Sequence, residues 1–277
     1  MRSWGAILVV AALLTGGPAL AASDAAPNAI LAAAVASTER GAFDEAVDQL
    51  ELLADSGFVH PDASYARAYV YVERARSRAK RPGDLGRAAA ALEESLLLRP
   101  DEAVEHALVT LRSEIARLRA REGNAPVLQR PSLGRAVAGL ASENLWANVA
   151  ALGSTLVTVG LALYLAVKRR AAEIAGATAI VVGLVFGLSG ASLAFAARHY
   201  RLTSRPAVVV VPEARLLDAD GRALAVRAPN PSAVQEGSLV YVREQREGRA
   251  HVEWGAVEGW VTASQLRLLQ TPFTGPR

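Results

Sequence analysis

The sequence predicts a multidomain protein in which an α-helical domain, a two-helix membrane hairpin and a small β-barrel follow one another along 277 residues. Three observations support this fold class. Apolar residues in the first half recur at spacings of three and four, which is typical of amphipathic helices. Two uncharged runs follow, Trp146–Val167 and Ile174–Ala197. After Ala207 the pattern changes to short alternating segments separated by turn residues, which is typical of strands.

The composition excludes several classes of protein. Hydrophobic residues make up 52% of the chain but aromatic residues only 5%, and this balance favours small-residue helices and membrane segments over an aromatic-rich core. Cysteine is absent, which excludes disulfides, cysteine-ligated metal sites and a thiol nucleophile. The net charge is +3, and nearly all basic residues are arginines, since Lys80 and Lys168 are the only lysines. This small positive charge does not indicate a nucleic-acid partner.

The first 21 residues have the layout of a secretory signal peptide. A basic start precedes the apolar stretch Trp4–Leu14, which is too short to span a bilayer, and Ala19-Leu20-Ala21 supplies the small residues that signal peptidase reads. We expect cleavage after Ala21, and the alternative is an uncleaved membrane anchor. Both interpretations place the following residues outside the cytoplasm.

The segment between the signal peptide and the membrane contains one pattern twice. Gly41 is followed five residues later by Ala46 and Gly83 by Ala88, and the second copy ends at Pro100. The pattern resembles the tetratricopeptide repeat, whose second helix begins after such a glycine and ends before such a proline. The resemblance implies stacked helix pairs in which Ala46 and Ala88 lie at close helix crossings. An unrelated alanine-rich bundle is the alternative.

Two features depart from a simple pair of repeats. The two glycines are 42 residues apart instead of 34, and we expect the extra residues to lengthen the helix over Tyr65–Lys80. A further helix is predicted by apolar residues at spacings of three and four, and it would cap the repeats because an isolated repeat cannot bury its apolar face. These residues are Leu108, Leu111, Ile115 and Leu118.

The two uncharged runs are long enough to span a bilayer. At about 1.5 Å per residue they measure roughly 33 and 36 Å, against a hydrocarbon core of about 30 Å. The turn between them carries Lys168-Arg169-Arg170 and is predicted to be cytoplasmic. Together with the export signal, this places both soluble domains in the periplasm of a bacterial inner-membrane protein. Neither run carries an aspartate, glutamate, lysine, arginine or histidine, which argues against a transporter or channel.

Glycines in the second run form a helix-packing pattern. Gly176, Gly183 and Gly190 recur every seven residues, and Gly183 with Gly187 forms Gly-x-x-x-Gly. Small residues on one face let another helix approach closely, so the pattern favours packing within the hairpin or against a partner's helix. The alternative is that glycine is simply common in membrane helices.

Three stretches of the last domain resemble the bacterial SH3-like domain. They are Ala225-Val226-Arg227-Ala228-Pro229, Glu236-Gly237-Ser238-Leu239-Val240 and Glu258-Gly259-Trp260-Val261. In that family a strand reads roughly N-V-R-x-x-P, a glycine turn leads a strand, and a G-W-V strand closes the barrel. This chain has Ala225 where many members have asparagine. The resemblance implies a small barrel that contains Gly259 and Trp260.

The two tryptophans of this domain receive different interpretations. Trp260, on the closing strand, is interpreted as packing in the core or at the rim of the barrel. Trp254 precedes Gly255 near a turn, and we expect an exposed indole there. Tryptophan is enriched at the centres of protein interfaces, so Trp254 is the candidate residue for partner binding.

The order of these parts resembles the BatE family of the bacterial aerotolerance (Bat) operon. The resemblance implies a membrane-anchored scaffold that works with membrane proteins containing von Willebrand factor A domains and with a MoxR-type ATPase. The alternative is a tether that binds peptidoglycan through the SH3-like domain. The expected parts are a signal peptide (1–21), a repeat domain (22–122), a linker (123–145), a first membrane span (146–167), a cytoplasmic turn (168–173), a second span (174–197) and an SH3-like domain (207–270).

No arrangement of side chains indicates catalysis. The four histidines, at positions 60, 106, 199 and 251, are far apart, and none belongs to a His-Glu-x-x-His motif. No glycine-rich phosphate loop precedes either lysine. We therefore expect a protein that is not an enzyme, with no catalytic, cofactor-binding or metal-ligating residue, no cofactor and no nucleic-acid partner.

Overall fold

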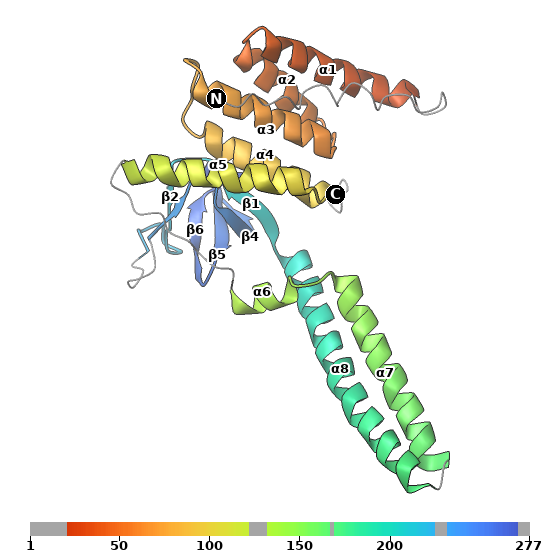
Figure 1. Ribbon diagram of the computed structural model, residues 1–277. Helices are drawn as coiled ribbons and strands as arrows, with labels where there is room; N and C mark the ends of the chain where they lie inside the picture. The colour runs from red at the N-terminus through yellow and green to blue at the C-terminus, as the bar shows by residue number, and fades with distance from the viewer. Residues whose placement is uncertain (1–20, 122–131, 167–168, 225–231, 271–277) are drawn as a thin grey trace. The chain divides into compact units, whose positions relative to one another are not determined.

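The chain folds into two units that differ in secondary structure. A computed structural model describes residues 21–121, 132–166, 169–224 and 232–270. Contacts assign residues 1–112 and 270–277 to one unit and 113–269 to the other. The first unit is helical, and the second contains two long apolar helices and an antiparallel β-domain (Figure 1). The expected order of α-helical, apolar-hairpin and β parts is confirmed. The expected signal peptide, except Ala21, lies outside the described residues.

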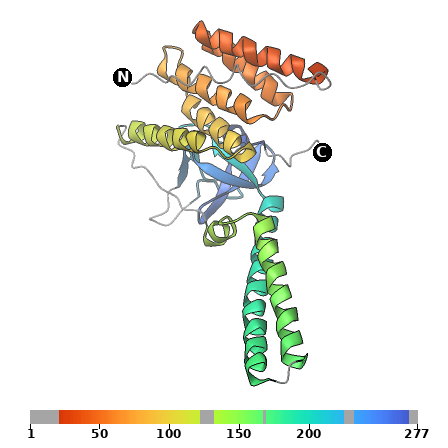
Figure 2. The same cartoon turned by 45° about the vertical axis from the view of Figure 1, so that its right-hand side comes forward.

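In the helical unit α1 packs on α2, α2 on α3 and α3 on α4 (Figures 1 and 2). The first half of α5 also belongs to this unit, and its second half, from Ser113, is assigned to the other. The bounds are α1 Ala21–Glu39, α2 Phe43–Asp55, α3 Pro61–Arg76, α4 Asp84–Leu98 and α5 Glu102–Arg121. Helix α5 is the further helix that the leucine spacing predicts. Its residues Leu108, Leu111 and Ile115 are buried, and Leu118 is half-buried.

Small residues allow the helices of this unit to approach closely. Gly41 and Gly83 have φ values of +75° and +82°, a left-handed conformation that glycine adopts without the steric cost of a Cβ. Each precedes a helix whose alanine, Ala46 or Ala88, is 0% exposed. Pro100 follows α4, in keeping with proline's inability to continue a helix. The packing of α2 and α4 therefore leaves room for only a methyl group at these alanines.

The connection between α3 and α4 corrects one expectation. The extra residues do not lengthen the helix to Lys80, because α3 ends at Arg76 and they form the loop before α4. Ser77 is extended, its backbone N–H bonds to the Arg74 carbonyl, and its hydroxyl donates to the same carbonyl over 2.9 Å. These bonds satisfy groups of the last helical turn that otherwise have no partner. Pro82 and Gly83 then follow and favour a turn over a helix.

The second unit contains an apolar helical hairpin. Helix α7, Glu143–Ala166, and helix α8, Arg170–Thr203, lie side by side and are both long and apolar enough to span a membrane (Figure 1). Helix α8 continues six residues beyond the uncharged run, which ends at Ala197. A short helix, α6 Leu133–Ala138, lies within the segment expected to be a linker.

Glycines bring the two long helices into backbone contact. A Cβ on Gly153 of α7 would lie 2.3 Å from the Gly187 nitrogen, and one on Gly183 of α8 would lie 2.7 Å from the Gly153 oxygen. Real Cβ atoms do not approach backbone this closely, so these positions exclude any side chain. The glycine pattern thus packs the hairpin on itself, and α7 contributes glycines that the sequence analysis did not single out. The buried glycines are Gly153, Gly160, Gly176, Gly183 and Gly190.

The β-domain contains a five-stranded antiparallel sheet and a two-stranded sheet. The larger has the order β6-β5-β4-β1-β7, and the smaller pairs β2 with β3. Apolar side chains from both sheets form one core that includes Leu216, Val240 and Val252. The strand bounds are β1 Arg205–Val209, β2 Glu213–Arg215, β3 Ala233–Gln235, β4 Leu239–Arg246, β5 Arg249–Trp254, β6 Val257–Thr262 and β7 Leu266–Leu268.

Two details of the β-domain bear on the expected SH3-like features. The stretch Ala225–Pro229 lies outside the described residues. Gly259, on β6, is buried, and a Cβ there would lie 3.3 Å from the Leu216 side chain.

A β-bulge at Arg243 interrupts the β4–β5 register. Because bulges re-aim side chains, it helps direct this arginine to the cluster described below.

The hairpin contacts generate a matched pair of substitutions. Gly153→Ala should lower the unfolding temperature of the full chain in detergent micelles, because its methyl group would overlap the backbone of α8. Overpacking of this kind costs about 1–3 kcal/mol. Gly187→Ala is the control, since its methyl group would meet nothing nearer than 3.7 Å. Equal melting of the two variants, followed by circular dichroism, would contradict this helix register.

Candidate functional site

Helix α3 carries two contrasting faces. Arg67, Tyr71 and Arg74 are spaced by four and three residues and are buried, so they share one face of the helix. Tyr65, Tyr69 and Val72 have the same spacing and are only half-buried. The first face is held by a polar network, and the second lines a pocket.

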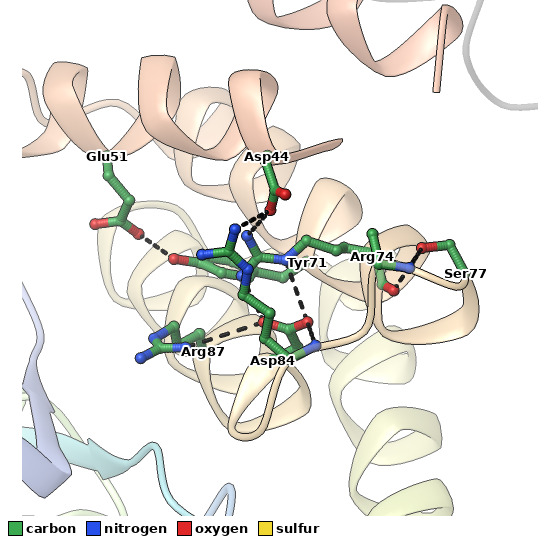
Figure 3. A network of polar contacts seen from close by, with 9 residues as sticks. Asp44, Glu51, Tyr71, Arg74, Ser77, Asp84 and Arg87 are labelled. Carbon is green, nitrogen blue, oxygen red and sulfur yellow. Dashed lines mark hydrogen bonds and ion pairs between the residues drawn. The ribbon is translucent and has the colours of Figure 1, made fainter. Parts of the chain in front are cut away.

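The strongest part of the network joins α3 to the start of α4. The Arg74 guanidinium donates two bonds to Asp84, over 2.6 Å from Nη2 and 3.2 Å from Nε (Figure 3). The two side chains are 3% and 1% exposed. Nη1 of Arg74 also bonds Asp44 of α2 over 2.9 Å. One buried arginine therefore connects three consecutive helices of the unit.

A second buried pair lies nearer the start of α3 and the end of α4. Arg67 Nη2 donates to Glu94 Oε1 over 2.8 Å, and the Ser64 hydroxyl donates to the same oxygen over 2.7 Å. Between the two arginines, the Tyr71 hydroxyl donates to Glu51 of α2 over 2.9 Å (Figure 3). Burying a charge is costly unless it is paired and hydrogen-bonded, and these partners satisfy that requirement.

The network shifts the titration of its members. Burial by itself raises the pKa of the Asp44 carboxyl, but hydrogen bonds from Arg74 and Arg81 outweigh it and hold the pKa below its usual range. Burial, together with the nearby Glu51 carboxylate, raises the pKa of Tyr71. These directions keep Asp44 ionised and Tyr71 protonated at neutral pH, so the charges and donors of the network remain in place.

The pocket lies between the other face of α3 and the first half of α5. Its volume is about 50 Å³, far below the roughly 300–1,000 Å³ of small-molecule sites. Its floor is apolar and its rim carries Glu73 and Arg76. Burial, followed by the charge of Glu73, raises the pKa of Tyr69, so this phenol stays neutral. The lining residues are Tyr65, Ala68, Tyr69, Val72, Glu73, Arg76, Leu92, Ala107, Thr110 and Leu111.

The second unit contains its own arginine cluster, which fixes α6 to the β-domain. Arg135 of α6 donates to Glu253 of β5 over 3.0 Å and to the Ser204 hydroxyl over 3.1 Å. Its guanidinium carbon lies 3.6 Å from the ring centre of Tyr241 and 4.5 Å from that of Tyr200. Arginine stacks on aromatic faces while its fork binds carboxylates. Arg135 thus joins α6, the end of α8 and the sheet.

The Glu253 carboxylate is nearly enclosed by its donors. Its side chain is 5% exposed and accepts hydrogen bonds from Arg135, Ser132 and Arg243. Burial raises the pKa of Glu253, but Arg135 and the other donors outweigh burial and hold the pKa below its ordinary value of 4.5. Glu253 is therefore ionised at neutral pH, as the bond to Arg135 requires.

One of the two tryptophans departs from its expected place. Trp254, expected to be an exposed partner contact, is 4% exposed and belongs to the core of the β-domain. The reason is its strand position, since it ends β5 opposite Val257 and points inward with Val252. Trp260, expected in the core or at the rim, is half-buried, and its ring lies 5.1 Å from the His251 ring, centroid to centroid, with the two planes tilted by 48°. It is therefore the tryptophan of this domain with accessible surface.

Acidic side chains of the described residues are largely engaged in ion pairs and do not gather into a metal site. Among residues 21–121, 132–166, 169–224 and 232–270, no group of three histidine, cysteine, aspartate or glutamate side chains is placed to hold a metal ion. The carboxylates Asp84, Glu94 and Glu253 are each engaged by an arginine. The pocket between α3 and α5 is the candidate site considered for the helical unit.

Comparisons with protein-family models, with curated proteins and with solved structures each returned no match for this chain.

The sequence analysis missed the residues that build the pocket and the clusters. It considered Tyr65 only as part of a longer helix, and it did not single out Arg74, Asp84 or Arg135. One signal was available, because Arg67 and Arg74 lie seven residues apart in an alanine-rich segment. Such a spacing places both on one helix face, but their acidic partners are identified only by the fold.

The cluster at Glu253 gives a prediction for pH dependence. Because its pKa is lowered in the folded protein, its contribution is fully present above about pH 4.5 and is lost as the pH falls through the lower, folded value. Glu253→Gln should therefore destabilise the β-domain at neutral pH by about 1.5–3 kcal/mol, the range for hydrogen bonds to charged groups. It should also flatten the loss of stability on acidification, measured by tryptophan fluorescence during thermal unfolding in micelles.

The control is Glu247→Gln, because the Glu247 side chain is 87% exposed. This variant should follow the parent at every pH. A Glu253→Gln protein that loses as much stability between pH 7 and pH 4 as the parent would contradict the assigned role of this carboxylate.

Proposed function

We propose that this chain is a membrane-anchored scaffold that binds a protein partner through the face of its helical unit formed by α3 and α5. The observation that carries the proposal is the small apolar pocket between these helices, lined by Tyr65 and Tyr69. A volume of about 50 Å³ suits an inserted side chain better than a free metabolite. Tyrosine is enriched at protein interfaces because its body is apolar and its hydroxyl remains solvated.

The rigidity of α3 supports this use. The buried pairs of Arg67 and Arg74 fix the face opposite the pocket, so the pocket side chains need little ordering on binding. Ordering costs of about 0.5–1.5 kcal/mol for each immobilised side chain reduce affinity. A helix that is already fixed therefore offers a better docking surface than a loop would.

Membrane anchoring is the second part of the proposal. The glycine-packed hairpin of α7 and α8 has the length and apolarity to cross a bilayer. Its outward side chains, such as Leu152 at 66% and Leu188 at 68%, are large, apolar and exposed, which suits contact with lipid and would be unfavourable in water. The basic turn favours the cytoplasm, and the N-terminal export signal favours a periplasmic location for both soluble parts.

The cellular setting is proposed from resemblance alone. The order of helical pairs, hairpin and β-domain resembles the BatE family, which implies membrane proteins with von Willebrand factor A domains, and a MoxR-type ATPase system, as partners in aerotolerance or envelope stress. The tetratricopeptide-like and SH3-like identities of the two soluble parts belong to the same proposal.

A tether to peptidoglycan is the second candidate function. The half-buried pair of Trp260 and His251 favours it, because an indole that keeps some accessible surface can contact a sugar ring. Residues beside it are mostly charged and paired, such as Arg243 with Glu258. We give the tether second place because the charged residues around this pair are engaged in ion pairs within the β-domain.

The scaffold is tested by photo-crosslinking in intact cells. A benzophenone amino acid at Tyr69 should capture a membrane protein with a von Willebrand factor A domain, and Val72→Glu should abolish capture because it places a charge in the apolar pocket. Leu52 is the control position, since it is apolar and 63% exposed but does not line the pocket. Equal capture from Leu52, or none from Tyr69, would contradict the docking face, and capture of sacculus glycan from Trp260 would favour the tether.

The orientation is tested with alkaline phosphatase, which is active only outside the cytoplasm. A fusion after Gln270 should be active and a fusion after Arg170 inactive, because the basic turn is expected inside and the β-domain outside. Immunoblots of the two fusions control for expression. The opposite pattern of activity would contradict the proposed topology.

A further inference from the structure

The segment between the β-domain and α7 exposes large apolar side chains that the protein leaves uncovered. Leu133 is 82% exposed and Leu140 is 77% exposed. Leu133 and Ala136 are three residues apart on the outer face of α6, and Leu140 follows in the next turn. We define Leu133, Ala136 and Leu140 as the α6 patch. Residues 132–142 contain no acidic side chain.

The opposite face of α6 is fixed. Arg135 is held by Glu253, Tyr241 and Tyr200, Ala138 is buried, and its carbonyl accepts a bond from the Trp146 indole over 3.2 Å. A Cβ on Gly134 would lie 2.7 Å from the Tyr200 hydroxyl, so α6 packs closely on the end of α8. The patch therefore faces outward because the other side is bound, and the leucines cannot turn inward without breaking these contacts.

The place of α6 along the hairpin identifies what covers the patch. Tyr200 is three residues beyond Ala197, the last residue of the uncharged run, which is about 4.5 Å along a helix. The polar headgroup region is roughly 5–8 Å thick on each side of the hydrocarbon core. Helix α6, which contacts Tyr200, thus lies at the depth of the headgroups if the hairpin spans the bilayer. Apolar side chains at this depth insert at the boundary between headgroups and acyl chains.

We infer that the α6 patch is a lipid-binding surface that inserts Leu133 and Leu140 into the outer leaflet at its interface. The inference rests on the membrane anchoring proposed above. Leu145, in the first turn of α7, is the next exposed large apolar residue along the chain and is 53% exposed. Because Arg135 joins α6 to Glu253, insertion holds the β-domain at a fixed height and orientation over the membrane.

The test uses the absence of cysteine in this chain, which lets single cysteines report single sites. The full chain, in phosphatidylcholine nanodiscs, carries an environment-sensitive NBD fluorophore at Leu133→Cys or Leu140→Cys. Quenching is measured with phosphatidylcholine that bears a nitroxide either high or deep on its acyl chain and, separately, with aqueous iodide. Two controls are Leu156→Cys, within α7, and Glu247→Cys, at an exposed turn of the β-domain.

Labels at Leu133 and Leu140 should lose fluorescence with the lipid nitroxide and be protected from iodide, whereas the label at Glu247 should show the reverse. Iodide quenching at Leu133 and Leu140 equal to that at Glu247, with Leu156 quenched by nitroxide deeper in the acyl chains, would overturn the inference and leave the hairpin anchor intact. Protection from both quenchers would overturn it in favour of a protein cover. Absence of lipid quenching at Leu156 would instead overturn the anchor, and the inference with it.

Discussion

Buried arginines paired with carboxylates set the arrangement on which the rest of this structure depends. Small residues dominate the packing: Ala46 and Ala88 are 0% exposed, and Gly153 touches backbone of the facing helix. Smooth alanine and glycine surfaces pack closely but specify register weakly, because few side chains interlock. The bidentate bond from Arg74 to Asp84 supplies the missing constraint, since removing one partner of such a pair costs about 3–5 kcal/mol.

This constraint explains how helix α3 can be fixed on one face while its other face stays partly exposed. Replacing a buried pair by apolar residues is often neutral or stabilising, so the pairs of Arg67 and Arg74 contribute specificity more than net stability. They use one face of α3 completely, and the tyrosines of the other face remain half-buried around the pocket. A helix buried all round would be more stable but would have no surface to offer. The partial burial of Tyr65 and Tyr69 is therefore the feature that functional reasoning must explain.

The sequence predicts the order of parts well because those signals are local. The length of the two uncharged runs identifies the hairpin, and the left-handed turns at Gly41 and Gly83 can be recognised from single glycines. The pocket and the arginine clusters involve partners 10 to 118 residues apart, and no local pattern encodes such pairings. The tryptophans show the same limit. The neighbouring glycine suggests that Trp254 is exposed. Its burial is instead determined by the alternation of side chains along β5, and the pairing of β5 with β6 shows that Trp254 is on the inward side.

The arginine of the second unit has a consequence that differs from that of the first. Arg67 and Arg74 connect helices within a single layer of packing, whereas Arg135 connects three kinds of structure: a short helix, the end of a long apolar helix and a sheet. A flexible linker at residues 132–142 would let the β-domain move freely over any surface. Because one face of α6 is fixed to Glu253 and Tyr200, this segment instead holds the β-domain in a defined position relative to the end of α8. The exposed leucines are thus placed by a charged residue, because Arg135 holds the inner face of α6 against Glu253 and Tyr200.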